Sequence, residues 1–80
     1  MSVAVSHLER ITIDPAINHG KPSVRGTRMS VQSLLELLAS AMTFDDVLAD
    51  HEFLERDDLL AVLEYAALTA GNQQIVRFDT

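Results

Sequence analysis

The spacing of apolar residues along the chain changes near residue 30, from every second position to every third or fourth. Residues 10–14 alternate between polar and apolar side chains and stop at Pro15, which predicts a short strand. Residues 23–29 predict a second short strand, broken or bulged at Gly26. Two strands of this length are barely stable alone, so we expect a hairpin that a helix face or a second subunit covers.

Two helices are predicted after the hairpin. From Ser30, the expected N-cap, apolar residues recur at helical spacing as far as Ala41 or Met42. The second helix is expected from Thr43 to about Asp50. Its threonine cap is followed by two acidic residues in the first turn, where carboxylates interact favourably with the helix dipole.

A third helix is predicted from about residues 55–57 to Gly71, a residue that commonly ends helices. One side of this helix is expected to face the core through Leu59, Val62, Leu63, Ala66 and Ala67. Further apolar residues lie outside that side, and they predict a dimer interface formed by Leu60, Tyr65 and Leu68.

These elements predict one mostly α domain over residues 10–71, with a flexible N-terminus at 1–9 and a tail at 72–80. A chain of 80 residues corresponds to one domain or a fragment of one. A chain this short buries a limited fraction of its surface, so self-association is expected. Residues 74–79 alternate like a strand, and we expect this possible C-terminal strand to order only on a partner.

The composition excludes several kinds of chemistry. The chain has no cysteine, so it has no disulfide, thiolate zinc site or thiol nucleophile. Its three histidines share no metal-binding spacing, and its paired carboxylates lie near predicted helix starts, where they act on the helix dipole. We therefore expect no enzyme activity, no cofactor and no metal. No apolar run is long enough to span a membrane and no secretory signal is present, so a cytoplasmic location is expected.

The net charge of −6 is distributed unevenly. Residues 1–28 hold four Lys and Arg against two acids, whereas residues 29–80 hold two against ten. The loop from Gly20 to Gly26 is not a phosphate-binding P-loop, because five residues separate its glycines and its lysine follows the first of them. Two interpretations remain: a structural turn, or a basic segment in which three side chains contact nucleic-acid phosphates, namely Lys21, Arg25 and Arg28.

The three-helix plan is that of helix-turn-helix domains, in which the third helix enters the major groove of DNA. Here that helix carries mainly acidic charges, whereas DNA binding depends largely on Lys and Arg. Any DNA contact is therefore expected from the basic N-terminal part of the chain.

The chain resembles the family known as domain of unknown function 433. The resemblance is carried by the block at residues 20–31, by Ile11-Thr-Ile-Asp-Pro, and by the apolar segments at 34–38, 44–48 and 58–66. It implies a homeodomain-like three-helix domain with an N-terminal hairpin, and an antitoxin paired with a small PIN-like ribonuclease toxin.

The sequence departs from the family's pattern at four places. His19 and Ala41 stand where glycine is usual, and His51-Glu52 replaces a common Tyr-Pro pair. Glu55 takes the place of the Thr or Ser that would cap the third helix. Because glutamate is a poor N-cap, we expect that helix to start late or to fray.

The first functional hypothesis is accordingly a type II antitoxin, a dimer that neutralises a PIN-like nuclease and assists in repressing its own operon. Arg77 and Phe78 in the tail are the predicted toxin-binding residues, because an arginine there could occupy the carboxylate cluster with which such nucleases hold metal. The acidic helices could instead occupy the toxin's RNA path. The alternatives are a stand-alone dimeric DNA-binding regulator and an interaction module with no nucleic-acid role.

Overall fold

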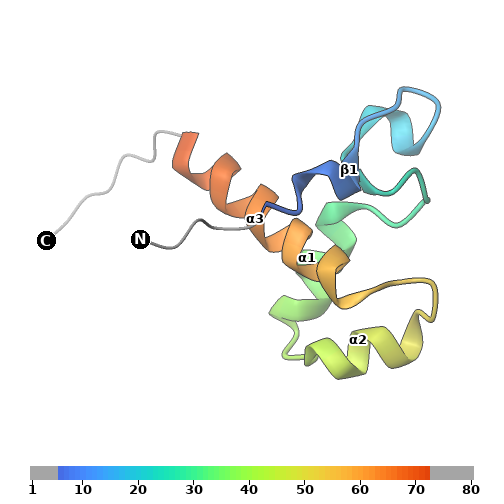
Figure 1. Cartoon of the computed structure of the whole chain (residues 1–80), viewed down its shortest axis with the longest axis vertical. Helices are drawn as coiled ribbons and strands as arrows, with labels where there is room; N and C mark the ends of the chain where they lie inside the picture. Colours follow the sequence, from blue (N-terminus) through green and yellow to red (C-terminus); the bar gives the residue numbers. More distant parts are fainter. Residues whose placement is uncertain (1–5, 73–80) are drawn as a thin grey trace, which may run out of the picture.

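A computed structural model describes residues 6–72, and it confirms the predicted architecture of three helices preceded by a short antiparallel hairpin (Figure 1). The single-turn 3-10 segments are η1 (Leu8–Arg10) and η2 (Asn18–Gly20). The strands are β1 (Ile11–Thr12) and β2 (Ser23–Val24), and the helices are α1 (Val31–Ala39), α2 (Phe44–Asp50) and α3 (Arg56–Asn72). The predicted C-terminal strand at 74–79 lies outside the described residues.

The hairpin is shorter than its sequence pattern predicts. Ile11 pairs with Val24 and Thr12 with Ser23 in an antiparallel register. The second strand stops at Val24 because Arg25 and Gly26 both have positive φ, +45° and +71°, which turns the backbone away. The expected cover for these strands is supplied by α3, which contacts both β1 and η1.

The predicted caps of the first two helices are present. The Ser30 side chain accepts a hydrogen bond from the backbone N–H of Ser33, and Thr43 forms a reciprocal capping box with Asp46. Helix α1 ends at Ala39, two or three residues earlier than the pattern predicted, because Ala41 adopts a left-handed conformation with φ +75°.

The start of α3 differs from the expectation of a late or frayed helix. It begins at Arg56, because the Asp58 side chain accepts a hydrogen bond from the backbone N–H of Glu55 at 2.8 Å. This hydrogen bond holds the first turn of α3 in place, although the Glu55 side chain does not cap the helix.

The core lies where β2 and the three helices meet, and it consists of Val24, Val31, Leu34, Val47, Leu54, Leu59 and Val62. The predicted core side of α3 was partly wrong. Leu63 is 40% exposed and Ala67 is exposed, whereas Ala61 is fully buried. The buried residues of α3 include Asp58, to which the hairpin is attached, and the C-terminal end of the helix extends beyond the other elements (Figure 1).

Candidate functional site

A buried carboxylate joins the hairpin to the start of α3. Asp58 is fully buried and accepts hydrogen bonds from Arg25 Nε at 2.9 Å and Arg25 Nη2 at 2.8 Å. Arg10 Nη1 also donates to Asp58, at 3.0 Å. These partners are required because an unpaired charge in a protein interior is costly. Two basic residues of the N-terminal part are thereby engaged within the fold.

Two further acidic residues complete this cluster. Arg10 Nη1 lies 2.6 Å from Glu55 Oε1, and Arg10 Nη2 lies 3.7 Å from Asp57 Oδ2. Hydrogen bonds to Glu55 and Asp58 raise the pKa of Arg10 further above its ordinary value. Burial raises the pKa of Asp58, but the bonds from Arg25, from the Glu55 backbone and from Arg10 outweigh it. The pKa of Asp58 is therefore below its ordinary value.

The three predicted nucleic-acid contacts differ in whether a carboxylate pairs with them. Arg25 pairs with Asp58, whereas Lys21 and Arg28 are exposed and have no carboxylate within salt-bridge distance among residues 6–72. Arg28 borders an open depression next to the half-exposed ring of Phe53. The loop is held by Asn18, whose Nδ2 donates to Ser23 Oγ at 2.7 Å and to the Arg28 carbonyl at 2.9 Å.

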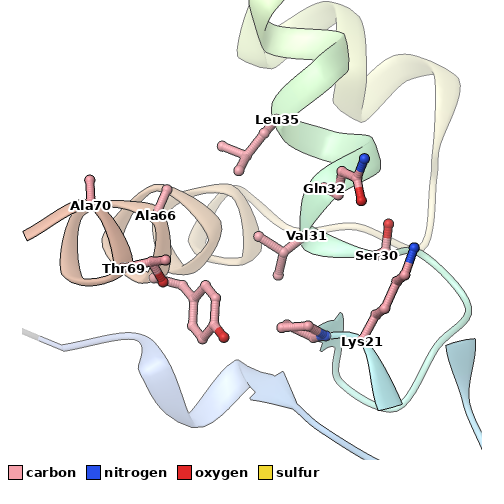
Figure 2. Close-up of a pocket in the computed structure, with 10 residues that line it drawn as sticks. Lys21, Ser30, Val31, Gln32, Leu35, Ala66, Thr69 and Ala70 are labelled. Atoms are coloured by element: carbon pink, nitrogen blue, oxygen red, sulfur yellow. The ribbon is translucent and has the colours of Figure 1, made fainter. Parts of the chain in front are cut away.

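An apolar groove of about 460 Å³ lies between α1 and the C-terminal half of α3 (Figure 2). The apolar part of its α1 wall is Val31 and Leu35, which are four residues apart and so lie on one side of that helix. Its other residues are Lys21, Pro22, Ser30, Gln32, Tyr65, Ala66, Thr69 and Ala70. The α3 wall is built largely from small side chains, and this is why the space between the two helices stays open.

One end of the groove is polar. Lys21 and Ser30 lie together there, away from the alanines of the α3 wall (Figure 2). An apolar ligand with one acidic group fits this arrangement, because its body would replace water on the alanine and leucine side chains and its charge would meet the lysine. A segment of another protein with apolar side chains and a carboxylate has this character.

Two of the predicted dimer residues border the grooves beside α3. Tyr65 packs against the core and lines the groove just described. Leu68 is 50% exposed and lines a second depression between α3 and the hairpin, together with Ile13. Leu60, the third, is half-buried and lies near Leu63 on the outer side of α3.

The outer side of α3 has little capacity to bind DNA. Its residues are Arg56, Leu60, Leu63, Ala67 and Ala70. Arg56 provides the single charge of this side, and its guanidinium lies 5.0 Å from the centre of the Phe44 ring. The remaining four side chains can neither donate to phosphates nor read base edges by hydrogen bonding.

The groove was not predicted from the sequence. The signals for it were present as pairs four residues apart, Val31 with Leu35 and Ala66 with Ala70. That these two pairs face each other depends on how the helices pack. The predicted toxin-binding residues Arg77 and Phe78 lie outside the described residues.

Within residues 6–72, no three acidic or histidine side chains are grouped so as to hold a metal ion. The same part of the chain contains no helix long and apolar enough to cross a membrane.

The fold and this groove define a small helical domain with an apolar groove on its surface. The chain belongs to the family described as Protein of unknown function (DUF433), whose family model matches residues 11–66. Comparisons with curated proteins and with solved structures gave no match.

Proposed function

We propose that the chain is the antitoxin of a type II toxin–antitoxin module, and that it binds and neutralises a PIN-like ribonuclease as a homodimer. The observation that carries the proposal is the groove between α1 and α3, which offers an apolar, lysine-ended surface to a protein ligand. Membership of the DUF433 family is compatible with this role, and the argument for the role is the groove on the surface of the domain.

The distribution of charge favours a protein partner over DNA. Arg10 and Arg25 are paired with acidic residues of α3 and its N-terminal turn, so their charges are not available to phosphates. The outer side of α3, which would face DNA in a helix-turn-helix complex, is apolar apart from Arg56.

The position of the groove near the end of α3 favours a two-part contact with the toxin, through the groove and through the tail. Helix α3 runs to Asn72, two residues beyond Ala70 on the groove wall. A toxin segment seated in the groove would therefore lie close to the start of the tail. Arg77 could then approach the carboxylates with which a PIN-like nuclease holds its metal, and Phe78 could pack beside them.

The groove is tested by co-expression with a PIN-like toxin encoded beside the antitoxin gene. Thr69→Arg places a long cation in the groove at an exposed position, so the domain should keep its fold. We expect loss of growth rescue and of co-purification, whereas Ala49→Arg, on an exposed position of α2, should behave like the parent chain. Full neutralisation by a folded Thr69→Arg variant would rule out the groove as the toxin site.

The tail requires a separate experiment. A chain ending at Gly71 keeps every groove residue, so we expect it still to bind the toxin. Because it lacks the tail, we expect this binding to be weaker and part of the nuclease activity to remain uninhibited. Arg77→Ala should reproduce much of this loss. Complete inhibition by the shortened chain would remove the tail from the mechanism.

Regulation of the operon is a secondary part of the proposal and rests on Lys21 and Arg28, the two exposed cations of the hairpin loop that have no salt-bridge partner among residues 6–72. Replacing both by alanine should lower the salt dependence of operator binding by the free antitoxin, in which no toxin carboxylate occupies Lys21. If the parent chain and its complex show no operator affinity at low salt, the protein neutralises its toxin without binding DNA.

A further inference from the structure

The outer side of α3 presents an apolar face with no counterpart among the described residues of the same chain. Leu63 is 40% exposed, Ala67 and Ala70 are exposed, and Leu60 is half-buried. These residues are spaced by three, four and three positions, which places them along one line of the helix. We call this line the α3 outer face.

We propose that a second copy of the chain covers the α3 outer face, with the two α3 helices packed antiparallel about a twofold axis near residue 65. This arrangement places Leu63 of one copy against the partner's Ala67, and Leu60 against the partner's Ala70. Each large side chain thus meets a small one, which lets the helices approach closely without a gap. A C2 interface repeats both contacts, so the face is complementary to itself.

Charge selects the antiparallel arrangement. In a parallel pair, the first turns of the two helices would lie side by side, and Arg56 of each copy, the single charge of this side, would repel that of the other. The antiparallel pair separates these turns and aligns the helix dipoles favourably. It also brings Arg56 to the end of the partner's α3, whose last turn carries no basic residue of its own.

The one acidic side chain beside the centre of the face is turned away from it. Glu64 Oε2 accepts a hydrogen bond from Ser6 Oγ at 2.9 Å, and Glu64 Oε1 accepts one from the His7 backbone N–H at 2.8 Å. The N-terminal segment therefore holds this carboxylate away from the contact. The outer face remains free of charge between Arg56 and the end of α3.

The dimer can be tested separately from the toxin contact through Leu63 and Ala67, which do not line the groove, whereas Ala70 borders both surfaces. We expect the parent chain, alone in solution, to sediment at twice its mass of 8.8 kDa. Leu63→Glu and Ala67→Glu should each raise the dimer dissociation constant more than tenfold, because the axis places two carboxylates in the apolar contact. Ala49→Glu, on an exposed position of α2, is the matched control and should stay dimeric.

Cysteine cross-linking tests the register, since the chain contains no cysteine of its own. When Leu63→Cys and Ala67→Cys chains are mixed and mildly oxidised, the mixed disulfide should predominate over either symmetric one. In the antiparallel pair, identical residues lie about four residues apart along the axis, too far for good disulfide geometry.

Three outcomes would overturn the proposal: a monomeric parent chain at every concentration, glutamate variants that remain dimeric, or symmetric disulfides that dominate. Loss of the dimer in a Leu63→Glu chain that still neutralises the toxin would separate this interface from the proposed function. Circular dichroism of each variant checks that the domain is folded.

Discussion

Arg25 reaches across the molecule to Asp58 with a two-pronged hydrogen bond, Nε to Oδ1 at 2.9 Å and Nη2 to Oδ2 at 2.8 Å. The same arginine donates from Nη2 to the carbonyl of Phe53 at 2.6 Å. One side chain from the hairpin loop thus holds both the first turn of α3 and the connection that precedes it. The planar guanidinium suits this double contact in a way that lysine does not.

Removing the buried charge should destabilise the fold strongly. Asp58→Asn leaves Arg25 without its carboxylate and Arg10 with only Glu55 and Asp57, and it puts a buried amide in place of the charge, so we expect a loss of about 3 kcal/mol in unfolding free energy. Urea denaturation followed by circular dichroism measures it. Asp57→Asn is the control, with an expected effect below about 1 kcal/mol, because Asp57 is half-buried and its Oδ2 lies 3.7 Å from Arg10 Nη2, too far for a strong hydrogen bond. Equal losses at the two positions would contradict the central role of Asp58.

Arg25 and Arg28 provide a test variant and a matched control for the arginine side of the contact with Asp58. Arg25→Ala should cost about 2–3 kcal/mol, because it deprives a buried carboxylate of its best donor while Arg10 remains. Arg28→Ala removes an exposed cation without a salt-bridge partner among residues 6–72 and should change stability by less than about 0.5 kcal/mol. Thermal melting of both variants at equal ionic strength distinguishes the two roles.

Acid should unfold the domain through Asp58. Its pKa is lower in the folded state than the ordinary 3.8, so its contribution to stability is fully present above that value and disappears as the pH falls toward the folded pKa. The pKa values of Asp46 and Glu64 are also lowered by their hydrogen bonds, from Thr43 and from His7 and Ser6. Unfolding free energy measured between pH 7 and about pH 2 should be nearly flat at first and then fall. Asp58→Asn should show a shallower fall.

The left-handed alanine after α1 offers a stabilising substitution. The backbone N–H groups of Ala41 and Met42 bond to the carbonyls of Leu38 and Leu37, which is the pattern of a Schellman cap. At φ +75°, a glycine would relieve a strain of about 1–2 kcal/mol and lose part of it through a more flexible unfolded chain. Ala41→Gly should therefore raise stability by about 0.5–1 kcal/mol.

The control for that substitution lies in α2. Ala49→Gly introduces the same change at an exposed position in the last turn of a helix and should lower stability by up to about 1 kcal/mol. If both glycines destabilise to the same extent, the conformation at Ala41 imposes no strain.

The local signals in the sequence were sufficient for the helices and their caps. Ser30 and Thr43 are followed by apolar residues at helical spacing, and both cap as predicted because a capping bond spans only three residues. The buried side of α3 was not predictable in this way. It depends on Arg10 and Arg25, which lie 48 and 33 residues before Asp58. The spacing of apolar residues within a helix contains no information about partners so distant in the sequence.

The candidate site also combines features that local sequence predicts with features that depend on long-range packing. The exposure of Lys21 and Arg28 agrees with their place in a polar loop, whereas the engagement of Arg25 needed the fold to be known. The groove arises because alanines on α3 face leucine and valine on α1. Either helix alone indicates only an apolar side.

The long separation between the hairpin arginines and Asp58 also sets the order of assembly. During synthesis, Arg25 emerges 33 residues and Arg10 48 residues before the carboxylate they hold. Helices α1 and α2 can form from local contacts as they appear, and Val24 can pack against Val31 and Leu34, but the hairpin lacks its contacts to α3 until the first turn of that helix has been made. The N-terminal third of the chain is therefore expected to fold last although it is synthesised first, and during that interval it depends on its short strands and polar turns to avoid wrong contacts.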